Sequence, residues 1–530
     1  MQPPTSSAHD RRWLTLGVLC LSLFVIVMDN TIVNVALPTL VRELGTTTSQ
    51  LQWVVDSYTL VFAGLLLAAG SLGDRFGRRG ALNVGLVVFG AASTVAAFAG
   101  GVNALVAARA VMGIGAALIM PATLSILTNV FTDTRERAIA IALWSAVAGV
   151  AVALGPVSGG FLLEHFWWGS VFIINIPVVA VALLAGRFLV PTSRDPAAPR
   201  IDWGGALLSI VGLTALVWSI IEAPERGWTS SGVVGGFAVA VVVLATFVRW
   251  ELRSSEPMLD LRFFTNARFT AASAAITLIA FALFGFIFMA TQYLQFILGY
   301  SALAAGVHTL PFAGAVILTA PLSSKLVERF GTKLVVTFGL LSFAAGMLTA
   351  AGTTIDSTYS RVFLAMVLMG GGMGLASAPA TESIMGSLPK EKAGVGSAVN
   401  DTTRELGGAF GVAIIGSVLS SLYAARLGDN LDGTVPAPVL DTAKESMGSA
   451  LAVGNQLGGS DGARIIDAAR DAFVHAMTRA SLVTAAFAAL GAVVALRWLP
   501  ARAIDHDDVA AVDALDLEGV GAIDTLEPAA

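Results

Sequence analysis

The chain has 530 residues, of which 56% are hydrophobic and only 13% charged, and its formal net charge is -5. A soluble protein carries about a quarter of its residues as charged groups, so this composition, with a mean hydropathy of +0.79, excludes a chain surrounded by water alone. It indicates a protein that lies in a lipid bilayer. The single cysteine, Cys20, excludes a disulfide within the chain.

Apolar stretches long enough to cross about 30 Å of hydrocarbon follow one another along the chain. The first has no secretory cleavage site, so Arg11 and Arg12 before it are interpreted as a cytoplasmic anchor rather than a twin-arginine export signal. The fourteen predicted spans are residues 14–38, 51–72, 82–100, 104–128, 138–161, 170–190, 204–221, 232–250, 269–298, 303–324, 334–352, 361–386, 395–423 and 474–499.

Basic residues in the connections predict the orientation of the spans. With the N-terminus inside, the inner tails and loops hold 21 lysines and arginines, whereas the short outer loops hold three. The positive-inside rule therefore predicts cytoplasmic termini. The connection 424–473 is then a long extracellular loop, within which residues 465–473 have helical spacing. The acidic tail 500–530 has no periodicity and is predicted to be disordered.

Three short motifs recur at nearly one offset and predict an internal repeat. Residues 74–79 (DRFGRR) return as 328–333 (ERFGTK), 121–126 (PATLSI) as 379–384 (PATESI), and the pair 136–137 (ER) as 391–392 (EK), at offsets of 254, 258 and 255. A preserved orientation indicates a parallel repeat about an axis normal to the membrane. The predicted units are a tail 1–13, a six-span half 14–190, an inserted pair with its linkers 191–268, and a second half 269–499.

Two glycine-containing motifs predict gates. The loop 70–79 (GSLGDRFGRR) places an acid among arginines at a tight turn, where it can lock two helices in one state. In the fifth span, small residues and a proline allow close helix approach and a kink. The alternatives are a simple inside anchor and mere close packing. The predicted gating residues are Gly70, Asp74, Arg75, Gly77, Arg78, Arg79, Gly155, Pro156, Gly159, Gly160, Glu328 and Arg329.

These motifs resemble those of a known family. The loop 70–79 resembles the signature loop of the major facilitator superfamily, and the fifth-span glycines resemble the antiporter motif of its exporters. Residues 28–38 (MDNTIVNVALP) and 168–177 resemble segments of its fourteen-span drug:proton antiporters (DHA2, multidrug-resistance-B or QacA-like). Residues 167–169 (WWG) depart from the usual Trp-Arg-Trp of these relatives.

The resemblance covers the chain to about residue 500. It implies an all-α polytopic membrane protein with a major facilitator fold, built from two six-helix halves and two inserted spans. It also implies a proton-coupled antiporter of lipophilic, mainly cationic compounds, which works as a monomer in the cytoplasmic membrane, in contact with lipid. No cofactor, metal or nucleic acid is expected.

Charged residues inside the predicted spans are the candidates for proton coupling. A charge near mid-bilayer costs roughly 2.5–3.5 kcal/mol, so it must be neutralised, paired or wet. Asp29 meets this condition, with a structural hydrogen bond to Asn34 as the alternative; for Arg109, which resembles a coupling arginine of the family, the alternative is snorkelling to the outer interface. The predicted coupling residues are Asp29, Asp56, Arg109, Asp401 and Glu405.

Substrate contacts are predicted from the acid excess and from aromatic side chains, which offer cation–π contacts. Glu382 is singled out because Leu124 occupies its repeat position, so the shared architecture did not require an acid there. For each aromatic residue the alternative is ordinary packing, and Arg404 can neutralise Asp401 or Glu405. The predicted binding residues are Asp29, Glu382, Trp53, Tyr58, Trp144, Phe284, Phe288 and Tyr293, whereas His308 is interpreted as structural.

Three functions compete at this point. The first is a drug:proton antiporter, and the second is a dedicated exporter of one lipid, siderophore or self-made antibiotic. A membrane enzyme or sensor is the third, but the sequence holds no phosphate-binding loop, nucleophile elbow or metal-ligand cluster. The first is favoured because the intramembrane acids suit protons and cations.

Overall fold

The structure is a computed structural model that describes residues 11–193, 202–255, 257–388 and 393–501. Within these residues the chain forms helices and no strand, and fourteen of the helical segments are long and apolar enough to cross a membrane. The predicted number of spans is therefore confirmed. The tail beyond residue 501 and the acid–base pair at 391–392 lie outside the described residues.

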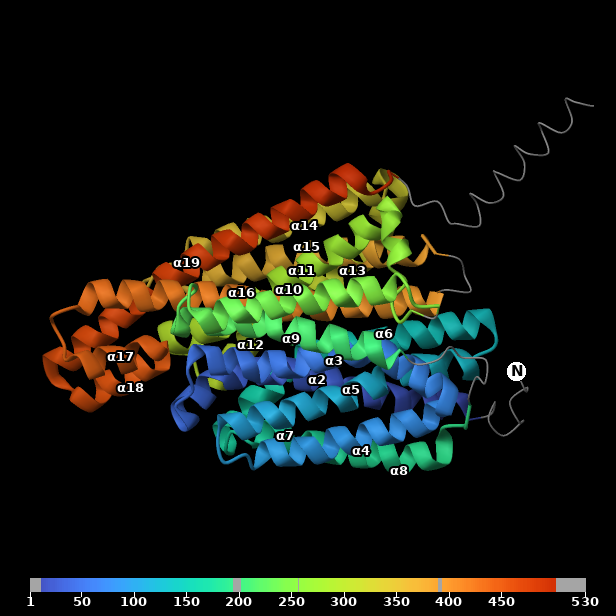
Figure 1. Cartoon of the computed structure of the whole chain (residues 1–530), viewed down its shortest axis with the longest axis horizontal. Coiled ribbons are helices and arrows are strands. Elements are labelled where there is room, and N and C mark those ends of the chain that lie inside the picture. The colour runs from blue at the N-terminus through green and yellow to red at the C-terminus, as the bar shows by residue number, and fades with distance from the viewer. Residues whose placement is uncertain (1–10, 194–201, 256, 389–392, 502–530) are drawn as a thin grey trace, which may run out of the picture.

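The helices run in chain order as follows. They are α2 (Arg12–Leu44), α3 (Thr48–Phe76), α4 (Arg78–Ala97), α5 (Val102–Val130), α6 (Thr134–His165), α7 (Ser170–Ile173), α8 (Asn175–Leu189), α9 (Trp203–Arg226), α10 (Ser231–Glu251), η1 (Leu261–Thr265), α11 (Ala267–Gln292), η2 (Tyr293–Ile297), α12 (Ala302–His308), α13 (Leu310–Phe330), α14 (Thr332–Ala351), α15 (Tyr359–Met385), α16 (Ala393–Leu431), α17 (Ala437–Glu445), α18 (Met447–Leu457) and α19 (Gly459–Trp498). Figure 1 shows them as one elongated bundle, with the first and last described residues at one end and α17 and α18 at the other.

The two halves repeat the same helix pairings. In the first half α3 packs on α5, α4 on α5 and α2 on α6; in the second, α13 packs on α15, α14 on α15 and α11 on α16. The loop glycines repeat as well, because Gly77 and Gly331 end α3 and α13 with φ of 124° and 82°. Side chains rarely adopt such angles, which explains why glycine stands at both positions.

Close helix crossings also recur at the same offset. A Cβ atom added to Gly115 of α5 would lie 2.8 Å from the backbone oxygen of Gly85 in α4. In the second half, one added to Gly339 of α14 would lie 2.6 Å from the backbone oxygen of Gly372 in α15. Backbone contact at matching positions supports the internal repeat with evidence that the motifs alone did not contain.

The segment 424–473 differs from the predicted loop. Helix α16 continues to Leu431, α17 and α18 follow, and α19 begins at Gly459, well before the predicted span 474–499. The Tyr423 hydroxyl donates to the Ala443 carbonyl (3.0 Å), and Arg426 pairs with Asp471 (3.0 Å). The helical spacing at 465–473 is confirmed, and the helices occupy far more of the predicted loop than this one stretch. They extend past the apolar stretches from which the spans were predicted.

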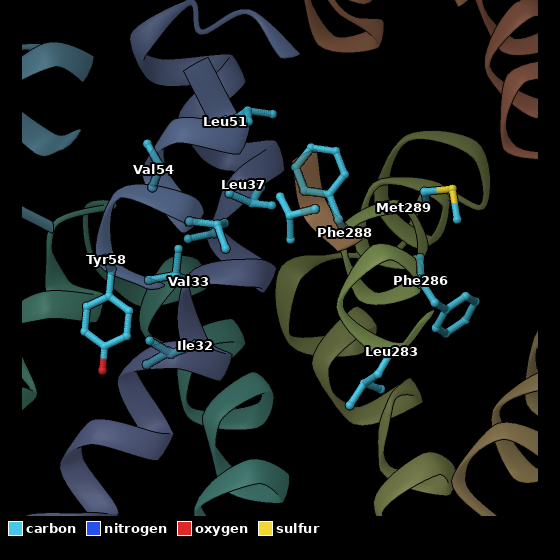
Figure 2. Packing of buried hydrophobic residues seen from close by; sticks show 14 of the residues in the cluster. Ile32, Val33, Leu37, Leu51, Val54, Tyr58, Leu283, Phe286, Phe288 and Met289 are labelled. Carbon is cyan, nitrogen blue, oxygen red and sulfur yellow. The ribbon is translucent and has the colours of Figure 1, made fainter. Parts of the chain in front are cut away.

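The halves contact each other toward the α17–α18 end. Gln52 of α3 donates to the carbonyls of Val412 (3.1 Å) and Ala413 (2.8 Å) in α16, and Gln295 donates to the Val35 carbonyl of α2 (3.0 Å). Phe288 is buried and projects from α11 toward α2 and α3 (Figure 2). This predicted substrate residue therefore contributes to the packing between the halves.

We expect the stability of the bundle to depend on close packing at these repeated helix crossings. Gly115→Ala places a methyl group against backbone atoms of α4, and such overpacking typically costs about 1–3 kcal/mol. Thermal unfolding in detergent should show a lower Tm. Gly149→Ala is the matched control, because nothing lies within 4 Å of its added Cβ. Equal melting of both variants and the parent would contradict this account of the crossing.

Candidate functional site

Four helices of the first half bring a buried polar cluster together. Asp29 of α2 and Arg109 of α5 are both 0% exposed. The Arg109 Nη1 group donates to Asp29 Oδ2, and Asn175 of α8 donates to Asp29 Oδ1 at 2.7 Å. The same amide lies 3.3 Å from the Ser93 hydroxyl of α4. Both oxygens of Asp29 are thus satisfied deep inside the bundle.

The structural hydrogen bond weighed as the alternative for Asp29 is present, but with Asn175 and not with Asn34, whereas the snorkelling weighed for Arg109 was wrong. The Asn34 amide donates to the Asn30 carbonyl of its own helix (3.0 Å) and not to Asp29. Arg109 does not snorkel to a surface, because no part of its side chain is exposed. Asn175 was not identified from the sequence as a site residue. The available signal was a carboxamide in an otherwise apolar span.

Helix α3 holds the guanidinium of Arg109 from another side. Arg109 Nε donates to the Val54 carbonyl (3.1 Å), and its Cζ atom lies 4.3 Å from the centre of the Tyr58 ring. Tyr58 was predicted as an aromatic wall for a cationic substrate. The structure places the protein's own cation over this ring. Arg109 Nη2 and the Tyr58 hydroxyl are buried without a hydrogen-bond partner among the described residues.

Asp56 is a second fully buried carboxyl of α3. It is 0% exposed, and neither carboxylate oxygen has a hydrogen-bond partner in the described part of the chain. It lies one helical turn from both Gln52 and Leu60, which pack against α16. Asp56 therefore lies on the side of α3 that faces the second half.

Helix α16 carries the acids of the second half. Arg404 Nη1 is 3.9 Å from Asp401 Oδ1, and Asn400 donates to the same oxygen at 3.3 Å. Glu405 Oε2 is buried without a partner among the described residues. The charges of Asp29, Arg109 and Glu405 all act on the Tyr58 hydroxyl. Tyr58 is thus linked electrostatically to the ion pair of one half and to an acid of the other.

The remaining predicted substrate residues are dispersed. Glu382 is exposed on α15, and Trp144 is half-buried on α6. Trp53 donates to Glu222 of α9 at 3.3 Å, and the Tyr293 hydroxyl donates to the Thr354 carbonyl at 3.0 Å. The structure does not bring these four residues together around one point.

Phe284 and His308 make contacts that are typical of side chains packed between helices. Phe284 is half-buried and lies against Gly408 of α16. His308 packs between Tyr300 and Tyr359, with ring centres 4.5 Å and 4.4 Å away, tilted against the first ring and edge-on to the second. These contacts agree with the structural interpretation of His308.

The fifth-span glycines pack beside the ion pair. A Cβ atom on Gly155 would lie 2.9 Å from Thr31 Cβ and 3.1 Å from the Met28 carbonyl, both on the turn of α2 that carries Asp29. Gly159 lies against Ile32 of the next turn, while Gly160 and Pro156 lie against α12 of the second half. One face of α6 therefore contacts both the Asp29 turn and the other half.

The loop 70–79 lies at the end of the bundle that holds the termini. Arg79 donates to the Arg187 carbonyl (2.5 Å), and the Arg78 amide donates to the Ser193 carbonyl (3.0 Å). In the repeat, Glu328 and Arg329 are exposed. The side chain of Asp74 is outside the described part of the structure. The predicted lock by this acid stays a prediction.

Comparison with known proteins now identifies the class. The model of the Major Facilitator Superfamily matches residues 19–412, and the chain belongs to this superfamily of membrane transporters. A bacterial homologue of the lysosomal transporter Spinster, in an inward-facing and unoccupied conformation, has the same fold (TM-score 0.64, 18% identity, covering 92% of this chain and 98% of that one).

Relatives of known name cover nearly the whole chain. The multidrug efflux pump LfrA of Mycolicibacterium smegmatis is 37% identical over 92% of this chain and 97% of its own length. The methyl viologen resistance protein SmvA of Salmonella typhimurium is 36% identical (88% and 93%). The tetracenomycin C resistance and export protein of Streptomyces glaucescens is 33% identical (93% and 93%).

Breaking the buried ion pair should destabilise the protein strongly. Arg109→Met leaves the Asp29 carboxylate without its cation, and the loss of one partner of a buried pair costs about 3–5 kcal/mol. Thermal unfolding in detergent should show a lower Tm, which the double variant Asp29→Asn/Arg109→Met partly restores. If the double variant melts at or below the single variant, the pairing does not account for the loss.

The ring and the hydroxyl of Tyr58 should be separable. Tyr58→Phe keeps the face that covers Arg109, whereas Tyr58→Leu removes it, and a desolvated cation–π contact contributes about 2 kcal/mol. The Tm in detergent should fall clearly for the leucine variant and little for the phenylalanine variant. Similar losses for both would assign the stabilisation to the hydroxyl and contradict this interpretation.

Proposed function

We propose that this chain is a proton-coupled antiporter that exports lipophilic, mainly cationic compounds across the cytoplasmic membrane, with both termini in the cytoplasm. The observation that carries the proposal is the fully buried Asp29–Arg109 pair within a bundle of fourteen apolar helices. The names of the relatives support export of toxic compounds as the physiological role. Small molecules and protons are the partners, and the protein works as a monomer surrounded by lipid.

Proton exchange follows from competition for one carboxylate. While Asp29 is ionised, Arg109 and Asn175 hold it. A proton from outside neutralises the carboxylate and removes most of its attraction for the guanidinium. Arg109 then keeps the Val54 carbonyl and the Tyr58 ring. Release of the proton inside restores the pair and returns the site to its starting state.

The second half supplies anionic groups for the passenger. Asp401 and Glu405 lie on α16. Arg404 pairs with Asp401, and Glu405 Oε2 has no hydrogen-bond partner among the described residues. The charge of Glu405 acts on Tyr58, as do the charges of Asp29 and Arg109, so a lipophilic cation that binds at Glu405 changes the charge around the same residue. Binding of the cation and protonation of Asp29 therefore oppose each other through like charge. Antiport requires this relation.

The number of protons exchanged decides which part of the proton gradient drives export. One pH unit supplies about 1.4 kcal/mol per proton, and one charge crossing 100 mV supplies about 2.3 kcal/mol. Exchange of one proton for one monovalent cation uses the pH gradient alone. Asp56, a buried acid without a partner in the described part of the chain, is a second proton site by which the voltage would contribute.

A dedicated exporter of one self-made antibiotic is the alternative, and the Streptomyces relative named for tetracenomycin C supports it. Purified protein in liposomes with an imposed pH gradient separates the two. Transport of several unrelated cationic dyes supports the broad exporter, whereas transport restricted to one neutral compound supports the alternative. Absence of any transport by the protein alone would overturn both.

Removal of the proton-accepting group should abolish exchange. In everted vesicles, Asp29→Asn should lose substrate-induced proton release by at least tenfold while membrane expression persists, and Asp29→Glu should retain part of it. Asp441→Asn, the same chemical change at an exposed position of α17, is the control. Parental rates for Asp29→Asn would disprove the assigned role.

A further inference from the structure

Helix α9, the first of the inserted pair, lies in the seam between the halves. Its residues Val217, Ile220 and Ile221 form one buried apolar cluster with Leu60 of α3 and with Ala409 and Ala413 of α16. Helix α10 packs on α9 and is largely exposed. The inserted pair is therefore attached through α9 to both halves at once.

A proline in α9 frees a backbone carbonyl for the contact with α16. Pro224 lies inside the helix and has no N–H group, so the carbonyl four residues earlier loses its helical donor. That carbonyl belongs to Ile220. It accepts a hydrogen bond of 2.7 Å from the hydroxyl of Ser417 in α16, and Ser417 is buried. The Ile220 carbonyl, which has no donor within α9 because of the proline, thus accepts a hydrogen bond from the second half.

The next residues of α9 bind the first half. The Ser49 hydroxyl of α3 donates to the Ile221 carbonyl at 3.2 Å, and the Trp53 indole donates to Glu222 Oε1 at 3.3 Å. These bonds lie in the last two turns of α9, at the level where Gln52 joins α3 to α16 directly. Consecutive residues of one helix therefore connect α3 and α16.

The geometry restricts how this end of the bundle can open. Antiport by alternating access, on which this inference rests, requires α3 and α16 to separate toward the α17–α18 end. Helix α9 can then follow only one of them, and its bonds to the other must break. The attachment to α3 has two side-chain bonds and that to α16 has one. Movement of α9 with α3 therefore breaks one side-chain hydrogen bond, whereas movement with α16 breaks two.

We propose that α9 is a latch, which holds the α17–α18 end closed through the Ser417–Ile220 hydrogen bond and moves with α3 when that end opens. This assigns a conformational role to the inserted pair that two six-helix halves alone do not provide. The latch depends on Pro224, since a residue with an N–H group there would supply the Ile220 carbonyl with a donor from its own helix.

The test measures conformation and not transport. In a Cys20→Ser background, spin labels at Glu43→Cys and Asp356→Cys, exposed positions of the two halves, report the distance across the α17–α18 end by pulsed spin resonance. Ser417→Ala should raise the ratio of open to closed populations about fivefold, the size expected from one lost hydrogen bond. In a Pro224→Ala background the same change should raise it less.

Matched variants keep the test decisive. Ser219→Ala removes a hydroxyl that bonds within α9 itself, to the Ala215 carbonyl at 2.8 Å, and should leave the distances unchanged. Ser417→Thr keeps the donor and should resemble the parent. A distance distribution for Ser417→Ala equal to that of the parent, or of Ser219→Ala, overturns the latch. These distances need neither substrate nor a pH gradient, so failure of proton coupling would be seen separately in the vesicles.

Discussion

A carboxylate and a guanidinium that meet without exposed surface impose the constraint on which this molecule depends. Taking either charge out of water is costly unless the partner and further hydrogen bonds compensate. Here Asn175 binds the second oxygen of Asp29, while the Val54 carbonyl and the Tyr58 ring hold Arg109. Four helices must therefore keep their registers for one pair to be tolerated. Because neutralising one carboxyl weakens the pair, the same constraint makes the site responsive to a proton.

Small residues connect this pair to the rest of the bundle. Gly155 and Gly159 let α6 lie directly on the turns of α2 around Asp29, and Gly160 lets the same face touch Leu303 of α12 in the second half. A side chain at any of these positions would separate the helices. Packed interfaces of this kind shift between discrete arrangements and do not deform continuously. A change at Asp29 that moves α2 against α6 would therefore also alter the contact between α6 and α12 of the second half.

The sequence predicted what local patterns determine. Apolar length determines the number of spans, and the loop glycines and repeated motifs determine the two-half architecture. It did not predict which faces of distant helices meet. The partner of Asp29 was sought at Asn34, near in sequence, whereas the actual partners Arg109 and Asn175 come from other helices. The same limit concealed Glu222 as the partner of Trp53. The extent of helix in segment 424–473 was missed for a different reason, because polar residues separate the apolar positions, such as Leu427, Leu440 and Ile465, that its helices bury in the core.

The repeat shows how two similar halves come to differ in chemistry. Gly113 and Gly115 of α5 correspond to Gly370 and Gly372 of α15, and each glycine lies against a neighbouring helix at its own position. At the same offset, Arg109 corresponds to Met366, a buried apolar residue. The shared helix crossings were retained while the cation was confined to one half. The acids Asp401 and Glu405 lie instead on α16 of the other half. Under the proposed function, the proton site and the acids for the cation therefore lie in different halves, and the charges of Asp29, Arg109 and Glu405 all act on Tyr58. Helix α9 joins the two helices that bear Tyr58 and Glu405. Coupling between the two sites requires no contact between proton and passenger, only that both charges act on one buried set of groups.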